Sequence, residues 1–116
     1  STGETVQRAF KACEILEKIN ISCSLISMHT IKPFDENILL NSISKVKGII
    51  TIEEHSVSGG LGEKCASILS QKNINLPFKI LGFPDEYMMN GSQKDVLDYY
   101  NMSDEKIAKI AQNMIK

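Results

Sequence analysis

Helical and strand-like segments alternate along this chain of 116 residues, and the alternation predicts an α/β fold. Three observations support this prediction. Apolar residues recur at helical spacing, short apolar runs of strand length lie between these segments, and glycine or proline stands at the breaks. Because the linkers are short, the strands should be parallel and joined by helical crossovers. We therefore expect one three-layer α/β/α domain with a mostly parallel sheet over residues 1–116.

The first half of the chain predicts a helix, a strand and a second helix. The first helix runs from Glu4 to about Ile19 and ends at Asn20. Its apolar positions are Val6, Ala9, Phe10, Cys13, Leu16 and Ile19. The apolar run 21–28 has the length of a strand, and Asp35 can cap the helix that follows. The apolar face of this second helix carries Ile38, Leu39, Ile43 and Val46.

The second half continues the alternation. Gly48 precedes an apolar run that predicts a strand ending at Glu53, and a helix follows the glycines after it. The apolar face of that helix carries Leu61, Cys65, Ile68 and Leu69. The remaining expected elements are a strand over 78–83, a polar loop over 84–92 and helices over 93–100 and 104–114, the last capped by Ser103.

Composition narrows the class of protein. Thirteen basic and fourteen acidic residues give a net charge of -1 without a basic cluster, which argues against a nucleic-acid partner. No apolar stretch reaches the roughly 20 residues that cross a bilayer, and no signal peptide is recognisable. We expect a cytoplasmic protein with no membrane partner. Three widely separated cysteines without a Cys-x-x-Cys pair argue against disulfides or zinc, so we expect all three to be small core residues.

The stretch 51–64 carries the densest group of polar residues. A strand there delivers Glu53, Glu54 and His55 to the carboxyl edge of the sheet, where ligands and partners collect in α/β folds. Glu53 and His55 share a face by strand alternation, so they could act together as an acid–base or metal pair. The alternative is a hydrogen-bonded edge or an interface cluster. His55 is the candidate catalytic residue, and the lack of a second His or Cys ligand nearby disfavours a metal site.

A glycine turn follows these residues. Gly59, Gly60 and Gly62 open a helix after a strand, a setting in which free N–H groups can hold an anion. A dinucleotide fingerprint would require a third glycine where Cys65 stands. The alternative is that the glycines permit a tight turn and a close approach of helix to sheet.

Two further loops should reach the same edge of the sheet. Lys32 follows the first predicted strand and could pair with Glu53 or Glu54, or it could be solvated while Pro33 and Asp35 set a turn and a helix cap. Asp85 follows the last predicted strand within a segment that reads as a turn.

Taken together, these segments resemble the C-terminal domain of the transketolase family of thiamine-diphosphate enzymes, which includes deoxyxylulose-phosphate synthases and 2-oxoacid dehydrogenase beta subunits. Four motifs in order carry the resemblance: Ser1-Thr2-Gly3-Glu4, Thr30-Ile31-Lys32-Pro33-Phe34-Asp35, Glu53-Glu54-His55 with Gly59-Gly60-Leu61-Gly62-Glu63, and Leu81-Gly82-Phe83-Pro84-Asp85-Glu86. The form with Glu-Glu-His is more similar to transketolases proper, or to split enzymes whose C-terminal half is a separate chain, than to the dehydrogenase subunits.

The resemblance implies an enzyme that transfers a two-carbon ketol unit between sugar phosphates. In this family thiamine diphosphate and Mg are held by N-terminal and middle domains, which this chain lacks, so the chain alone should be inactive and should bind neither. The C-terminal domain packs on those domains and helps to build a homodimer. The resemblance therefore implies interface or scaffold roles for Lys32, Asp35, Glu53, Glu54, His55, Gly59, Gly60, Gly62 and Asp85.

The start of the chain leads to a further expectation. Ser1-Thr2-Gly3 enters a helix directly, as the turn after a strand would, so we expect one or more N-terminal strands upstream of Ser1. The family sheet is mixed and five-stranded, and an earlier strand lies between the first two predicted here. Two other kinds of function stay open: a stand-alone module that binds an anion or nucleotide, and a module that recruits another subunit.

Overall fold

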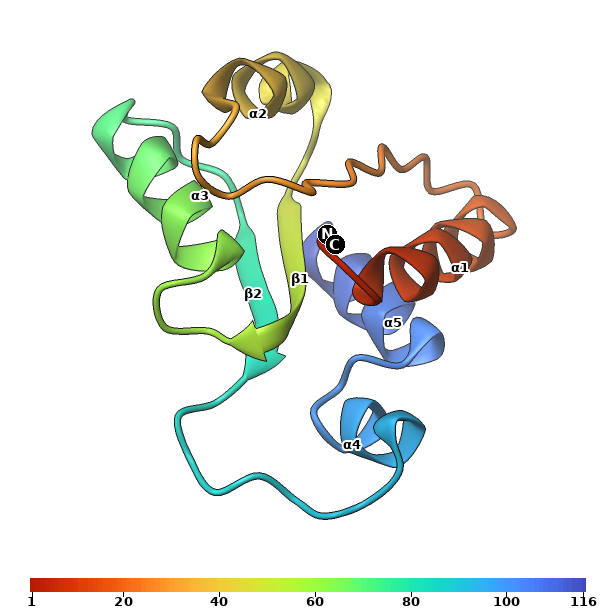
Figure 1. Ribbon diagram of the computed structural model, residues 1–116. Coiled ribbons are helices and arrows are strands. Elements are labelled where there is room, and N and C mark those ends of the chain that lie inside the picture. The colour runs from red at the N-terminus through yellow and green to blue at the C-terminus, as the bar shows by residue number, and fades with distance from the viewer.

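The computed structural model describes residues 1–116 and confirms the α/β class (Figure 1). The elements in chain order are α1 (Thr5–Glu17), α2 (Glu36–Ser42), the 3-10 helix η1 (Ile43–Lys45), β1 (Ile49–Ser56), α3 (Leu61–Gln71), β2 (Phe78–Phe83), α4 (Gln93–Tyr99) and α5 (Asp104–Met114). The expected bounds agree most closely at β2 and α5. None of these helices is long and apolar enough to cross a membrane.

The sheet consists of β1 and β2, which pair in parallel and are connected through α3. The register runs from Ile49 opposite Phe78 to Ile52 opposite Leu81, and it shifts before Ser56 meets Phe83. The irregular stretch of β1, between Ile52 and Ser56, contains Glu53, Glu54 and His55. The carboxyl ends of both strands therefore deliver their polar loops to one edge of the sheet.

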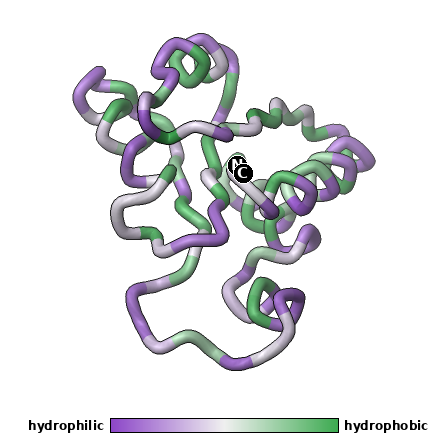
Figure 2. Tube along the Cα trace, in the orientation of Figure 1, coloured by the Kyte–Doolittle hydropathy of each residue, from purple (hydrophilic) through white to green (hydrophobic).

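Two apolar clusters cover the two faces of this sheet. One joins α1, α4 and α5 to the strands through Ala9, Ala12, Leu16, Ile52, Leu81, Leu97, Met102, Ile107 and Ala108. The other lies on the opposite face, with α2, η1 and α3, and contains Met28, Leu39, Ile43, Leu61, Cys65, Ile68 and Leu69. Figure 2 shows apolar residues alternating with polar ones along α1 and α5, as expected of helices that bury one side. The three-layer arrangement follows from these two clusters.

The prediction of a strand over 21–28 is wrong. The segment pairs with neither β1 nor β2, and it lies apart from them (Figure 1). Its ladder-like backbone bonds go to Ser1: the Ser1 amino group donates to the Ile26 carbonyl at 2.9 Å, and the Met28 N–H donates to the Ser1 carbonyl at 2.8 Å. A single partner residue is too short a ladder to define a strand.

The inward faces of the first two helices differ from the prediction at three residues. Phe10 is 55% exposed, Ile19 46% and Ile38 44%. In α1 the small side chains of Ala9 and Ala12 face the sheet, because they let the helix backbone approach it closely. The helix ends at Glu17, two residues before the expected Ile19, and Asn20 lies in the turn that follows, with a left-handed φ of 62°.

Candidate functional site

Strand β1 is longer than predicted, and this places the candidate residues inside it. The strand ends at Ser56 instead of Glu53, so all three polar side chains belong to its last residues. Glu53 is fully buried at 0% exposure, whereas the His55 side chain is 61% exposed. Both side chains lie on one side, as alternation predicts, with Nδ1 of His55 3.9 Å from a Glu53 oxygen.

The carboxyl group of Glu53 closes the N-terminus of α3. One of its oxygens accepts from the Leu61 N–H at 2.8 Å and the other from the Gly62 N–H at 3.0 Å. These are among the first N–H groups of the helix, which have no partner within it. The carboxyl group therefore occupies the position at which an external anion would bind. We call the bonds from Leu61 and Gly62 to Glu53 the Glu53 latch.

Glycines make the latch sterically possible. A side chain at Gly60 would collide with the carboxyl group of Glu53, and one at Gly62 would collide with Ile80 and approach the Thr51 hydroxyl at 2.9 Å. Gly59 has a φ of 74°, and its N–H donates to the Glu63 side chain at 2.7 Å. The glycines thus serve a tight turn and close packing, and two N–H groups of the candidate anion site already have a partner.

His55 faces outward with one nitrogen engaged. Its Nδ1 lies 2.6 Å from the Ser56 carbonyl oxygen, and because a carbonyl only accepts, Nδ1 carries the proton. The nearest Glu53 oxygen is 3.9 Å from Nδ1, too far for a hydrogen bond. Since both Glu53 oxygens already accept backbone bonds, the two residues do not form the acid–base pair that the sequence suggested. The Nε2 atom of His55 is the group left to meet a partner.

Glu54 points to the other face and connects β1 with α4. Both of its side-chain oxygens accept from the Gln93 amide, at 2.9 and 3.1 Å. Gln93 is the first residue of α4, whose N-cap Ser92 accepts from the Asp95 N–H at 3.2 Å. Sequence reasoning placed the start of this helix correctly but had no signal for the long-range partner.

The loop after residue 28 reaches the glycine turn but forms no ion pair with the glutamates. A shallow hollow of about 400 Å³ separates the two loops, with Lys32 and Phe34 on one side and Gly60 and Lys64 on the other. Lys32 is exposed, and neither of the two salt bridges in the structure involves it. The exposure of Lys32 agrees with the alternative in which its side chain is solvated and does not pair with Glu53 or Glu54. Asp35 caps α2 as expected, accepting from the Ile38 N–H at 3.1 Å.

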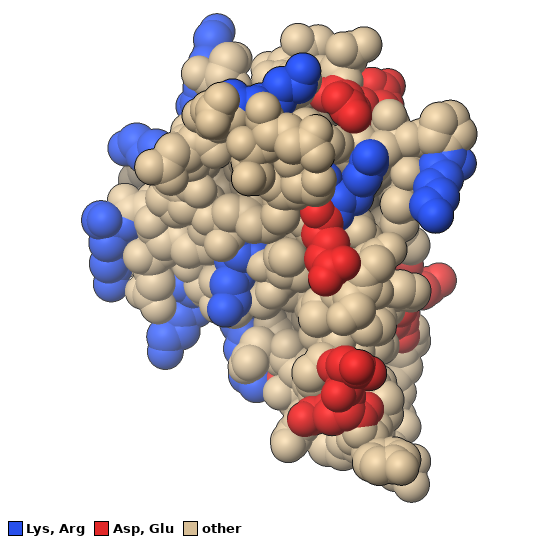
Figure 3. Space-filling model, turned by 90° about the vertical axis from the view of Figure 1, so that its left-hand side faces the viewer, with Lys and Arg blue, Asp and Glu red and all other residues tan.

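Asp85 lies in the loop after β2, which projects from the lower end of the molecule (Figure 1). The neighbouring Tyr87 is fully exposed. Figure 3 shows one group of acidic side chains near the lower end and further acidic side chains in the middle and at the top of the same face, while basic side chains lie mainly on its left-hand and upper parts. The loop, His55 and Lys32 are accessible at the carboxyl end of the sheet.

The cysteines are not activated nucleophiles. Burial raises the pKa of Cys65 to about 11, and desolvation also raises that of Cys23 to about 11. Thiols with such values are protonated at neutral pH, whereas reactivity requires the thiolate. Cys65 is buried as predicted, but Cys13 and Cys23 are only half-buried, so the expectation of three core cysteines is correct for one.

Comparisons with known proteins agree with this geometry. Residues 1–107 match the family model of the transketolase C-terminal domain. A putative transketolase C-terminal section from Methanocaldococcus jannaschii is 38% identical over 94% of this chain and 34% of its own length. One subunit of the apulose-4-phosphate transketolase of Phocaeicola vulgatus is 34% identical over the whole chain and 36% of its own length.

More distant relatives have the same domain in longer chains. The 1-deoxy-D-xylulose-5-phosphate synthase of Clostridium tetani is 34% identical over 94% of this chain, which covers 18% of that enzyme. A solved structure described as a split-gene transketolase, an inactive beta4 tetramer, superposes with a TM-score of 0.84 at 27% identity, over 98% of this chain and 36% of that one. The chain thus spans about a third or less of these relatives. It belongs to the transketolase C-terminal domain family.

Proposed function

We infer that this chain is the C-terminal domain of a cytoplasmic, thiamine-diphosphate-dependent enzyme of the transketolase type, which transfers a two-carbon ketol unit between sugar phosphates. The family match over residues 1–107 is the observation that carries this proposal. The names of two relatives, one a C-terminal section and the other a transketolase subunit, support a role as one part of a larger assembly. In this role the domain supplies scaffold and dimer interface.

The residues of this chain do not fit a diphosphate group. The helix N-terminus that follows the turn from Gly59 to Gly62 donates its Leu61 and Gly62 N–H groups to Glu53. A diphosphate there would have to displace a buried carboxyl group and would leave it without partners, at a cost on the order of several kcal/mol. This supports binding of thiamine diphosphate and Mg by the N-terminal and middle domains of the enzyme, and we assign no chemical step to this chain.

The exposed groups at the carboxyl end of the sheet are suited to contact those domains. His55 Nε2, Lys32 and the Asp85–Tyr87 part of the loop after β2 are accessible, and side-chain hydrogen bonds connect β1, which carries His55, to the two helices beside it. The Glu53 latch fixes the α3 turn, and the Glu54–Gln93 bonds fix the start of α4. Rigid presentation lowers the entropy lost when a partner binds.

A reconstitution assay tests the proposal. The chain alone, supplied with a ketose phosphate, an aldose acceptor, thiamine diphosphate and Mg, should show no transfer. Addition of the cognate cofactor-binding section should restore transfer, and sedimentation of the mixture should show one complex. Transfer by the chain alone would contradict the scaffold role, and the absence of transfer and of a complex after mixing would contradict the assembly.

The anion-binding alternative makes a different prediction. A stand-alone module should bind nucleotides or sugar phosphates saturably at the turn from Gly60 to Gly62, because that is its candidate anion site. Calorimetry against a panel of phosphate ligands distinguishes the two functions. We expect no saturable binding by the chain, since the Glu53 latch fills the site.

A further inference from the structure

Cys13 and Cys23 belong to two segments of the chain that pack together. Cys13 lies toward the end of α1, and Cys23 lies in the extended segment 21–28, which runs back past this helix after the turn at Asn20 (Figure 1). Both side chains are half-buried, and both line the same cavity beside α1. The fold therefore brings together two thiols whose spacing in the sequence argues against a disulfide.

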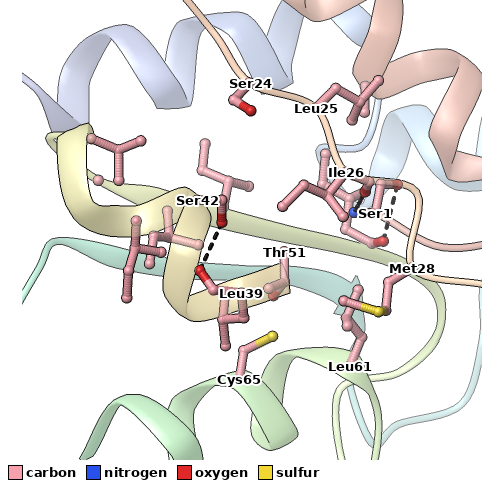
Figure 4. Close-up of a pocket in the computed structure, with 17 residues that line it drawn as sticks. Ser1, Ser24, Leu25, Ile26, Met28, Leu39, Ser42, Thr51, Leu61 and Cys65 are labelled. Atoms are coloured by element: carbon pink, nitrogen blue, oxygen red, sulfur yellow. Dashed lines mark hydrogen bonds between the residues drawn. The ribbon is translucent and has the colours of Figure 1, made fainter. Parts of the chain in front are cut away.

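The third cysteine lies on the other face of the sheet. Cys23 packs against the apolar cluster that joins α1, α4 and α5 to the strands. Cys65 belongs to the opposite cluster, and Figure 4 shows it on α3, where it lines a separate pocket with Met28 and Leu61. Cys13 and Cys23 are consequently the two cysteines that can meet.

The two thiols interact with each other directly. Burial raises the pKa of both, to about 11 for Cys23. A hydrogen bond between the two side chains opposes this rise at Cys13 and adds to it at Cys23. The Glu17 carboxylate, one helical turn after Cys13, also raises the pKa of both thiols. An interaction of this kind requires the two sulfur atoms to be neighbours.

These surroundings suit a disulfide better than a thiolate. A thiolate is a charge, and the apolar cavity and the Glu17 carboxylate both disfavour it. A disulfide carries no charge and needs no hydrogen-bond donor, so burial does not penalise it in the same way. Strongly oxidising disulfides are those whose reduced form is stabilised. The raised pKa values show that the thiolates of this pair have no such stabilisation.

From this geometry we propose that Cys13 and Cys23 are a redox-active pair that forms a reversible disulfide with a low-molecular-weight disulfide as the oxidant. The thiolate of one cysteine attacks the S–S bond of the oxidant, and half of the oxidant leaves and takes up a proton. The thiolate of the other cysteine then attacks the protein sulfur of this mixed disulfide, and the second half leaves in the same way. The pair loses two electrons and two protons, which reduce the oxidant to two thiols.

A redox titration of the chain with reduced and oxidised glutathione tests this proposal. Two of the three thiols should be lost, and Cys65 should stay free. Trypsin cleaves after Lys11 and Lys18, so each cysteine of the pair lies in its own peptide and mass spectrometry should find the two peptides joined. We expect the effective concentration of the pair to be at least about tenfold higher in the folded chain than in urea, because a crosslink that fits the fold favours the native state.

Single substitutions supply the controls. Cys13→Ser and Cys23→Ser should each lose at most one thiol, since either variant can go no further than a mixed disulfide with glutathione. Cys65→Ala should form the disulfide as the parent chain does, because the third cysteine lies on the other face of the sheet. The parent chain should carry no stable glutathione adduct, and dithiothreitol should restore its thiols.

Three results would overturn the proposal. The first is a stable glutathione adduct on the folded parent chain without an internal disulfide. The second is an effective concentration that is equal in the folded and unfolded chain, and the third is a disulfide that includes Cys65 or joins two chains. None of these measurements depends on ketol transfer, so failure of the reconstitution assay and failure of this proposal are distinguishable.

Discussion

The two edges of β1 differ in how completely their backbone groups are hydrogen-bonded. On one side the strand pairs with β2, and its residue Glu53 forms the latch under α3. On the other side only the carbonyl of Ile52 has partners, and they come from Ser1, Thr2 and Thr5. The same strand therefore has one edge that pairs with β2, with one irregularity before Ser56, and one edge on which a single carbonyl is bonded.

This difference separates contacts between neighbours in sequence from contacts between distant parts of the chain. The side toward β2 uses local sequence, since strand, glycine turn, helix and strand follow one another within residues 49–83. The other side requires contacts between residues far apart, such as Ser1 and Ile26. Substitutions on the β2 side should consequently cost more stability in this chain than changes at the contacts of Ser1.

Removal of the latch should have the largest effect. Glu53→Ala leaves the Leu61 and Gly62 N–H groups buried without partners and creates a cavity, so we expect a loss of about 3 kcal/mol in the free energy of unfolding. Urea unfolding measures it. The control is Glu54→Ala, which removes only the bonds with Gln93 near the surface and should cost less than about 1 kcal/mol. Equal losses would contradict the special position of Glu53.

A methyl group at Gly62 should have the next largest effect. Gly62→Ala drives a Cβ into Ile80, and overpacking of this kind costs about 1–3 kcal/mol. Combination with Ile80→Ala should recover part of that cost, which a double-mutant cycle detects. Gly91→Ala is the matched control, since the added Cβ would lie 3.4 Å from its nearest heavy atom, which is an ordinary contact distance. Additive effects of Gly62→Ala and Ile80→Ala would show that α3 does not press on β2 as described.

The edge of β1 that contacts Ser1 should respond to pH through the amino group of Ser1. Its native pKa lies below the unfolded value of 8.0, so near neutral pH the unfolded chain binds more protons and stability rises as the pH increases to 8. N-terminal acetylation removes the titrating group but keeps the N–H. The acetylated chain should therefore be more stable than the free chain at pH 6.5, and the gap should narrow by pH 9. A gap that is independent of pH would contradict burial of a charged amine.

The accuracy of the sequence-based predictions follows the same division between local and long-range contacts. Segments that bury one face against a neighbour in sequence, such as Phe78–Phe83 and Asp104–Met114, were predicted with the observed bounds. The length and apolar character of the run 21–28 predict a strand, but a strand also requires a pairing partner, which these features do not reveal. Phe10 was assigned to the core because it is apolar, yet the smaller Ala12 packs there.

The candidate site shows a similar limit. The motif 51–64 identified the right region, and alternation correctly placed Glu53 and His55 on one side. The motif does not reveal that the buried carboxyl group of Glu53 bonds to the backbone of the following helix, because this bond depends on how closely α3 approaches β1. The Glu54–Gln93 contact spans 39 residues and leaves no local signal.

His55→Ala should have the smallest effect on stability and, if the scaffold role is right, a small effect on catalysis. The side chain is mostly exposed and bonds only to the adjacent Ser56 carbonyl, so its loss should change the free energy of unfolding by less than about 0.5 kcal/mol. In the reconstituted enzyme, turnover should fall by less than about tenfold, through weaker assembly, and saturating amounts of the cofactor-binding section should recover it. A hundredfold loss that persists with assembly intact is the size expected for removal of a general acid or base. That result would assign a catalytic role to the exposed end of β1, where His55 Nε2 is the nitrogen available to exchange a proton.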